Sequence, residues 1–555
     1  MDRATRLRMD YTAMLLRAYS RRMQDAPGEV AAFEAKLREP RHWQESTLAG
    51  ILTANATTEY GRRHGFATLA GYAEYRRRVP VVGYEDLRPA IERMLAGERD
   101  LLVRGAPSYF STTSGATADP KFIPGAQGSI VAGCEAILAR NACLRRDHPR
   151  AFAGRALFIV GNAAEGRTAA GASYGAMTGF GYYAGQIGFP GRPFPYEVFT
   201  LRDYATRYRT ILRLALAARD LSAISVYNPS TLLLLLEKAA GIWDQLIEEI
   251  AAGGLPVGLD APEEVRAALL PELGPDPDRA AELAALRDAG PRAWWPRLAV
   301  LLCWKGGSLS FYFEELRRWI GDLPVRDLGI LASEAVVTIG VDDTTAGGVL
   351  LPESAFFEFV PEDGEDREPR GAWELEDGAR YRLLLTTHGG LYRYDLADVV
   401  RVERHHFASP VLTFLHRAGR VHSFTGEKLT EHQVTLAVRA AAAAAGLRLA
   451  SFTAIPQWGL PPRYELRAEL AEGEERERCP LFARLLDEEL KKVNLEYAGK
   501  RDSGRLAAAG LVLVAAGGFE ALRRRRTAQD AQYKEVHLVC DPGLAPQLEI
   551  LETVS

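Results

Sequence analysis

A stretch of small and hydroxyl-bearing residues around one lysine is the part of this sequence best suited to chemistry on an anion. It spans residues 109–124 and reads YFSTTSGATADPKFIP. Small residues let the backbone approach a phosphate closely, hydroxyl and N–H groups bind its oxygens, and Lys121 can neutralise its charge. A surface turn rich in Ser, Thr and Gly is the competing interpretation. The Walker pattern G-x-x-x-x-G-K-[S/T] is absent, so the stretch is not a P-loop of that type.

Glycines and polar residues also follow two predicted strands in the middle of the chain. The apolar run 298–304 is typical of a strand covered on both faces, and it ends at Lys305-Gly-Gly-Ser308. A helix follows, and then a second strand over 325–331 that ends at Ala332-Ser-Glu334. This order is that of a parallel sheet, in which ligands bind beyond the carboxyl ends of strands. We therefore expect Gly306-Gly307 and Ser333-Glu334 to lie at a ligand site.

A passage rich in glycine and aromatic residues, 171–191, could line an apolar ligand pocket. The candidates for this acyl pocket are Tyr174, Phe180 and Tyr182. For any one of these side chains, packing on the protein core is an equally good explanation.

The remaining elements divide the chain into a large and a small part. Helices are expected up to about residue 75 and over 128–146. Residues 79–87 introduce another helix, with Asp86 near its start. Antiparallel strands are expected over 354–403. Beyond about 415 the pattern is that of a small α+β domain, with helices at 431–445 and 480–495 and strands near 450–455, 463–468, 510–515 and 534–539. The predicted fold class is α/β, with an N-terminal domain over 1–416, a hinge at 417–422 and a mobile C-terminal domain over 423–555.

Composition limits the function further. The 555 residues carry a net charge of −4, from 68 basic and 72 acidic side chains, so wholesale binding of nucleic acid or membrane is not expected. The five cysteines are scattered, which favours the reducing cytoplasm, and no secretory signal or membrane span is evident. The richness in Ala, Gly and Arg indicates a high-GC bacterial genome. His405-His406 and the run Arg523–Arg526 are interpreted as surface features rather than as a metal site or a nucleic-acid patch.

Taken together, these motifs resemble those of the adenylate-forming enzymes, and more closely the Gretchen Hagen (auxin-responsive) family of acyl acid–amido synthetases. The resemblance runs from about residue 105 to 535. The matching stretches are 113–121 with Ile123-Pro124, 331–334, 355–361, 386–394 with Asp398-Val-Val, 426–431, and Gln532-Tyr-Lys534.

The resemblance implies a two-step reaction, in which a carboxylic acid attacks the α-phosphate of ATP and an amine, usually of an amino acid, then takes the acyl group. It implies that the β- and γ-phosphates are held by Thr113, Ser114, Gly115, Thr117 and Lys121. It also implies that Glu334 ligates Mg²⁺, a hard ion suited to carboxylate and phosphate oxygens. Ser333 would contact the α-phosphate, Gly306 and Gly307 the adenine, and Asp398 the ribose. Arg417 would reach the ribose or the α-phosphate, while Lys428 and Lys534 would act from the small domain.

Two departures from the family pattern bear on this expectation. Ala116 and Ala118 replace a hydroxyl residue and a glycine that are usual in the loop, and Glu535-Val536 follow Lys534 in place of Pro-Arg. Two alternatives therefore stay open: transfer of the adenylate to a thiol, such as coenzyme A or a carrier protein, and a nucleotide-binding homologue with impaired catalysis. A monomer is favoured.

Overall fold

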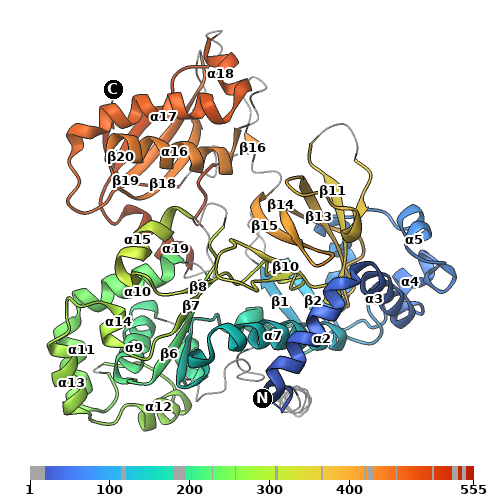
Figure 1. The fold of residues 1–555 in the computed structure, drawn as a ribbon, viewed down its shortest axis with the longest axis horizontal. Coiled ribbons are helices and arrows are strands. Elements are labelled where there is room, and N and C mark those ends of the chain that lie inside the picture. The colour runs from blue at the N-terminus through green and yellow to red at the C-terminus, as the bar shows by residue number, and fades with distance from the viewer. Residues whose placement is uncertain are drawn as a thin grey trace. The chain divides into compact units, whose positions relative to one another are not determined.

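The computed structural model divides into two compact units, unit 1 (Met1–Leu396 with Val400–Phe414) and unit 2 (Ala397–Val399 with Leu415–Ser555) (Figure 1). The described residues are all except 1–18, 20, 114–120, 180, 181, 183–193, 202, 228, 257, 307–309, 364–366, 418–420, 423–426, 428, 458, 460, 503–505, 528–534, 540–545 and 555.

Unit 1 begins with helices, as the sequence predicts. They are α2 (Ala26–Arg38), α3 (Pro40–Asn55), α4 (Glu59–Arg63), α5 (Tyr72–Arg78) and α6 (Tyr84–Leu95). The Asp86 carboxylate accepts a 2.7 Å hydrogen bond from the Gly83 N–H and so caps the start of α6. Gln44, fully buried on α3, donates to the carbonyls of Pro352 and Ala355 and accepts from the Phe357 N–H. These hydrogen bonds fix α3 to the seven-stranded sheet that contains Phe357.

A four-stranded parallel sheet carries one side of the candidate site. Its order is β3 (Arg155–Phe158), β6 (Leu221–Ser225), β7 (Val300–Leu302) and β8 (Val325–Arg326). Leu301 packs in one hydrophobic cluster with residues of α9 (Tyr204–Ala217), α10 (Pro229–Gly241) and α15 (Ser310–Ile320), which Figure 1 shows gathered beside these strands. Val300 and Leu302 pack in a second cluster with Leu144 of α7 (Gln127–Asp147). Both faces are covered, as the continuous apolar run predicts.

Two further sheets complete unit 1. A four-stranded sheet has the order β2 (Lys121–Gly125), β1 (Tyr109–Thr113), β5 (Ser173–Gly175), β4 (Gly166–Arg167). A seven-stranded sheet has the order β12 (Arg370–Gly371), β11 (Phe356–Pro361), β13 (Arg380–Thr386), β14 (Tyr394–His406), β15 (Ser409–Arg417), β10 (Gly348–Leu350), β9 (Thr338–Ile339). The antiparallel pairing expected over 354–403 is present, for example between β11 and β13.

Unit 2 is built on a four-stranded sheet with helices. The sheet order is β18 (Leu449–Gln457), β19 (Arg463–Leu470), β20 (Gly510–Val514), β21 (Ile550–Val554). The helices are α16 (Glu431–Ala445), α17 (Cys479–Val493), α18 (Leu495–Asp502) and α19 (Gly518–Thr527), and a short pair of strands, β16 (Val421–His422) and β17 (Leu429–Thr430), precedes α16. The predicted fold class, an α/β architecture with parallel and mixed sheets and a smaller α+β part, is confirmed.

The structure corrects three of the expected elements. The strand predicted over 325–331 ends at Arg326, because Gly329 has φ of +80° and turns the chain toward Thr338. The strand predicted near 534–539 is a single bridge between Ala454 and Leu538, and the fourth strand of that sheet is β21. The small-residue stretch was predicted as a loop over 111–121, but residues 111–113 and 121 belong to β1 and β2, because the two strands pair as far as Thr113 and Lys121.

Candidate functional site

The β1–β2 hairpin brackets the predicted phosphate loop. Thr113 pairs with Lys121, so the two ends of segment 114–120 are held side by side. The predicted residues Ser114, Gly115 and Thr117, together with Ala116 and Ala118, lie outside the described residues. Lys121 Nζ lies 5.2 Å from the centroid of the Tyr84 ring, and the Tyr84 hydroxyl accepts a 2.8 Å hydrogen bond from the Phe122 N–H. Tyr84 therefore supports the end of the hairpin where Lys121 begins β2.

The same hairpin contacts the Ser333–Glu334 turn. Buried Ser111 donates a long hydrogen bond of 3.4 Å to the Ser333 carbonyl oxygen. Ser111 pairs with Ile123, so strand alternation puts Ser111 and Lys121 on one face of the hairpin. Leu331 bridges Val336, which leaves Ser333 and the partly exposed Glu334 at the tip of a short turn. Two predicted parts of the site that are 222 residues apart in sequence thus meet through β1.

The exit of β7 lies against a loop that precedes β10. A Cβ atom on Gly306 would lie 3.5 Å from Thr413 Cγ2 and 3.6 Å from the Ala346 carbonyl oxygen. Lys305 Nζ donates to the carbonyls of Asp343 and Thr345 at 2.7 and 3.2 Å. The backbone at Gly306 therefore packs beside segment 342–347, and Gly307 lies outside the described residues.

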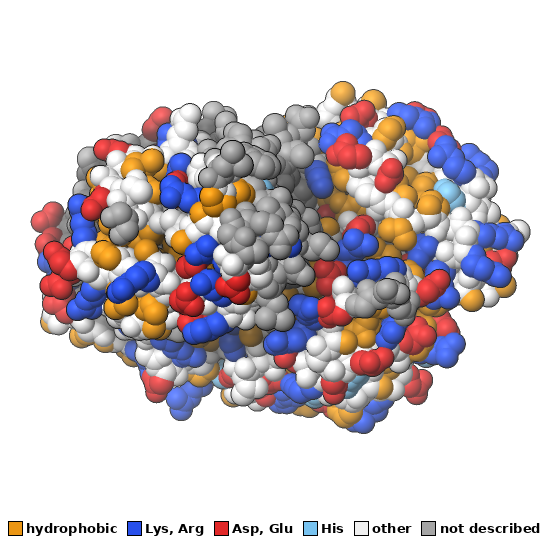
Figure 2. Space-filling model, turned by 90° about the horizontal axis from the view of Figure 1, so that it is seen from above, with side chains coloured by type: hydrophobic (Ala, Val, Ile, Leu, Met, Phe, Trp, Pro, Cys, Tyr) orange, Lys and Arg blue, Asp and Glu red, His pale blue; other side chains and the backbone are white. Residues whose placement is uncertain are grey.

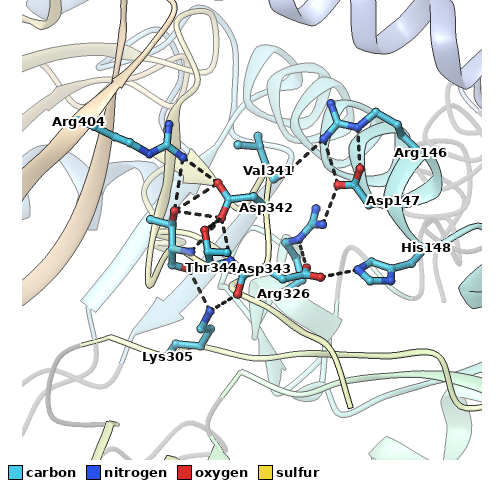
Figure 3. Close-up of polar contacts among 11 residues, drawn as sticks. Arg146, Asp147, His148, Lys305, Arg326, Val341, Asp342, Asp343, Thr344 and Arg404 are labelled. Carbon is cyan, nitrogen blue, oxygen red and sulfur yellow. Dashed lines mark hydrogen bonds and ion pairs between the residues drawn. The ribbon is translucent and has the colours of Figure 1, made fainter. Parts of the chain in front are cut away.

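A polar network frames segment 342–347 (Figure 3). Asp342 accepts hydrogen bonds from the N–H and hydroxyl groups of Thr344 and Thr345 and pairs with Arg404 at 2.8 Å. Burial alone would raise the pKa of Asp342, but these hydrogen bonds outweigh it and lower the pKa to about 2. The carboxylate thus stays charged at neutral pH and holds the turn.

Asp343 anchors the same segment to the parallel sheet and to α7 (Figure 3). Buried Arg326, the last residue of β8, donates to Asp343 at 2.7 Å and to Asp147 at 2.8 Å. His148 Nε2 lies 2.7 Å from Asp343 Oδ2, and Arg146 pairs with Asp147. Acidic and basic groups alternate through the network and neutralise one another. The network therefore stabilises the segment and is not a cluster of like charges suited to bind an ion.

The residues predicted to act on the ribose and from the small domain are only partly described. Asp398 is partly buried within β14, and Arg417 ends β15, but the Arg417 side chain is not described. Lys428 and Lys534 lie outside the described residues. Two arginines near Asp398 in sequence have carboxylate partners, Glu358 for Arg393 and Glu403 for Arg401.

Two buried glutamates in unit 2 were missed by sequence reasoning, although both belong to the stretch 426–431 that carries the resemblance. Glu427 accepts a 2.6 Å hydrogen bond from the Tyr464 hydroxyl, and the Asn494 side chain donates to its carbonyl at 2.8 Å. Glu431 accepts a 2.6 Å hydrogen bond from the His537 N–H. These contacts fix the residue before Lys428 and a residue three positions after Lys534.

The departure at Glu535-Val536 is accommodated on β18. The Ser451 hydroxyl donates to the Glu535 carboxylate at 3.1 Å, and the Thr453 hydroxyl donates to the Val536 carbonyl at 2.7 Å. The chain is therefore held directly after the Gln532-Tyr-Lys534 stretch.

The aromatic candidates for the acyl pocket have different surroundings. Tyr174 is partly buried on β5 and meets Phe122 edge-on, with ring centroids 5.2 Å apart. Tyr182 is 7% exposed in the main hydrophobic cluster, and its hydroxyl donates to the Phe194 carbonyl at 2.8 Å. Phe180 lies outside the described residues. For Tyr182 the structure favours the core explanation that the sequence left open.

Charged residues and histidines that the sequence analysis singled out have partners within the protein. Basic and acidic side chains are intermixed on the face in Figure 2. Arg523 and Arg524 both pair with Glu520 on α19. His405 pairs with Asp377, and no group of three or more His, Cys, Asp or Glu is placed to hold a metal within the described part of the chain. Among the described helices, none has the length and hydropathy to span a bilayer.

Comparison with known proteins identifies the family. The GH3 family N-terminal domain matches residues 29–325, the central domain residues 348–417 and the C-terminal domain residues 432–542. The chain belongs to the GH3 family. This confirms the resemblance that the sequence motifs carry.

Similar GH3 proteins are described as amido synthetases. A probable indole-3-acetic acid-amido synthetase of Oryza sativa subsp. japonica is 28% identical, with 94% of this chain and 95% of that protein covered. A jasmonoyl–L-amino acid synthetase of Nicotiana attenuata is 27% identical over 88% of this chain and 89% of that protein. The solved structure of a GH3 acyl acid amido synthetase in complex with 2,4-DB matches with a TM-score of 0.85 at 20% identity, covering 96% of this chain and 99% of that chain. The relatives from Oryza sativa and Nicotiana attenuata are plant proteins and do not support the bacterial source that was predicted from composition.

Proposed function

We propose that this protein is an ATP-dependent acyl acid–amido synthetase. In the first half-reaction a carboxylate oxygen of the acid attacks the α-phosphate of ATP, and pyrophosphate leaves. In the second, an amine, preferably of an amino acid, attacks the acyl carbon, and AMP leaves. The GH3 domains and the amido synthetase relatives support the reaction class.

The observation that carries the proposal at the level of the site is the contact between the hairpin and the Ser333–Glu334 turn. It brings the hairpin that carries Lys121, a cation, into contact with the turn that carries Glu334, a carboxylate. In this arrangement Lys121 binds the leaving pyrophosphate oxygens, and the Ser333 hydroxyl binds the α-phosphate. Preorganised donors of this kind stabilise charge that develops in the transition state.

Glu334 fits a divalent cation such as Mg²⁺, because it is a partly exposed carboxylate next to the predicted phosphate loop. When bound, the ion would neutralise phosphate charge and make pyrophosphate a better leaving group. The protein's own part is to place the partly exposed Glu334 at the tip of the Leu331–Val336 turn.

For the remaining predicted residues, we propose the roles that follow from the family resemblance. Gly306 and Gly307 bind the adenine with their backbone, Asp398 and Arg417 bind the ribose, and Lys428 and Lys534 act from unit 2 on the developing charge. The acid is an apolar or aryl carboxylate, in keeping with the names of the relatives. The buried free cysteines Cys134, Cys143, Cys303 and Cys479 favour a reducing cytoplasm as the location.

The test is ATP-dependent release of pyrophosphate with a panel of carboxylic acids, each with and without the standard amino acids and with and without coenzyme A. We expect release with at least one acid and, by mass spectrometry, an acyl–amino acid product. Lys121→Ala and Glu334→Ala should each lower the rate at least 100-fold, whereas the matched controls Lys492→Ala and Glu376→Ala should not. Lys492 pairs with Glu489 and Glu376 with Arg370, both on the surface.

Each alternative gives a different result in the same assay. Acyl transfer to coenzyme A without any amide product would establish a thiol ligase. Tight binding of ATP with no pyrophosphate released by any acid would establish a nucleotide-binding protein without catalysis, and would refute the synthetase proposal.

A further inference from the structure

The exits of three parallel strands are tied together beyond the end of the sheet. The Trp304 N–H donates to the Tyr227 carbonyl, next to the end of β6, at 3.1 Å. The Trp304 indole N–H donates to the Gly329 carbonyl, beyond the end of β8, at 2.7 Å. The chain that leaves β7 is therefore fixed on both sides just before it reaches Gly306.

Asp327 makes the closest tie between the β7 and β8 exits. Its Oδ2 accepts a 2.8 Å hydrogen bond from the Lys305 N–H, and its Oδ1 accepts a 2.7 Å hydrogen bond from the Gly329 N–H. The residue is 2% exposed, and a carboxylate without such donors would be costly there. Gly329 has φ of +80°, and a Cβ atom there would lie 2.2 Å from the Thr338 carbonyl oxygen, so this turn requires glycine.

Lys305 makes the second tie, from β7 to segment 342–347. A lysine beside a nucleotide site would ordinarily be assigned to a phosphate of the nucleotide. Here the ammonium donates to the carbonyls of Asp343 and Thr345, within a segment that Asp342 and Arg326 already hold (Figure 3). Burial lowers the pKa of Lys305, and the neighbouring Asp327 and Asp343 oppose this effect. The side chain is thus committed to the protein frame.

We propose that Lys305 and Asp327 are positioning residues for the nucleotide. Lys305 joins the two ties, because its N–H bonds to Asp327 and its ammonium to the 342–347 segment. Together they hold the Gly306 backbone beside Thr413 and Ala346, where we expect the base to lie against it. The proposal rests on the proposed function, because the base at Gly306 is the adenine of ATP.

The test measures ATP binding by titration calorimetry in the absence of any acid, so that no turnover is needed. Asp327→Asn replaces one acceptor by a donor, and Lys305→Met keeps the aliphatic stem but removes the ammonium. We expect each to weaken ATP binding about tenfold, the loss of one charge-assisted hydrogen bond. In the pyrophosphate assay, both should raise KM for ATP more than they lower kcat, and should leave KM for the acid unchanged.

Lys305→Arg is the conservative variant, because a guanidinium can also donate to two carbonyls. It should keep ATP binding within about threefold of the unmodified protein. Lys36→Met is the matched control, since Lys36 is also partly buried but pairs with Glu353 at 2.6 Å. It should bind ATP normally.

The outcomes separate this inference from the proposed function. ATP binding by Lys305→Met or Asp327→Asn equal to that of the unmodified protein would overturn the inference, and so would a Lys36→Met variant that binds as weakly as Lys305→Met. A protein that binds ATP but never releases pyrophosphate would refute the synthetase proposal alone. A protein that does not bind ATP at all would refute both.

Discussion

The Tyr392-Arg393-Tyr394 stretch is part of the family resemblance, yet its arginine lies in the core of unit 1. Arg393 is 5% exposed and donates to both oxygens of Glu358, which is 1% exposed, at 2.9–3.2 Å. It also donates to the carbonyls of Arg76 and Val79 at 2.7 and 2.8 Å. We predict that Arg393→Met destabilises unit 1 strongly.

The magnitude follows from what the substitution leaves behind. Among the described side chains, Glu358 would keep only the Tyr72 hydroxyl, at 3.3 Å, as a hydrogen-bond donor. Removing one partner of a buried ion pair costs about 3–5 kcal/mol, because the other charge stays buried and unpaired. Replacing both partners, in Arg393→Met with Glu358→Gln, removes the unpaired charge and should recover about half of the loss.

The pH dependence gives the sign of the effect. Burial raises the pKa of Glu358, and Arg393 opposes this rise. Without Arg393 the pKa in the folded state rises further, so the folded protein then binds a proton more readily than the unfolded chain does. The destabilisation of Arg393→Met should therefore be largest at neutral pH and above, and should shrink as the pH falls through the raised pKa.

The assay is urea unfolding followed by tryptophan fluorescence. Of the eight tryptophans, Trp458 alone lies in unit 2, so the signal reports mainly on unit 1. A loss below about 1 kcal/mol at pH 7 would refute the buried-pair explanation. A double variant whose loss equals the sum of the single losses would also refute it, since independent residues add in this way.

Two further predictions concern packing near the site. Gly389→Ala should cost about 1–3 kcal/mol in urea unfolding, because the added Cβ would lie 2.4 Å from the Pro124 carbonyl of β2, whereas Gly50→Ala on α3, with open space around it, should not destabilise. Tyr182→Phe should cost about 1 kcal/mol through the lost hydrogen bond to Phe194 and leave acid selectivity in the pyrophosphate assay unchanged. A changed selectivity would return Tyr182 to the acyl pocket.

Local pattern was enough to predict most elements of the fold. The run 298–304 predicted β7 because both of its faces are covered, and the cap at Asp86 marked the start of α6. The short β8 was predicted too long, because Ile330 and Leu331 are apolar although the chain has already turned at Gly329. The edge strand β21 was missed because its residues are mostly exposed and lack the alternation that marks a half-buried strand.

The candidate site could be proposed only from residues that lie together in one motif, and contacts between distant segments could not be predicted. The contact of Ser111 with Ser333 depends on tertiary packing, and the local sequence around either residue does not predict it. The roles of Glu427 and Glu431 were missed for a similar reason: their partners Tyr464 and His537 come from other parts of unit 2. The sequence Glu427-Lys428 does not itself indicate that the Glu427 side chain is buried.

The residues that carry the family resemblance therefore divide between two tasks, and burial separates them. Arg393 and Glu427 are buried charged residues whose partners are protein groups, so their task is to fix the backbone. Lys121 and Glu334 are partly exposed, and in our proposal they bind phosphate and a divalent cation. Lys305 and Asp327 stand between these cases. A base that stacks on the Gly306 backbone requires that neighbouring side chains turn away from it, and the contacts of Lys305 and Asp327 with segment 342–347 and with Gly329 do so. In our proposal, the strand exits can present backbone to a nucleotide because the side chains of Lys305 and Asp327 are bonded to protein groups.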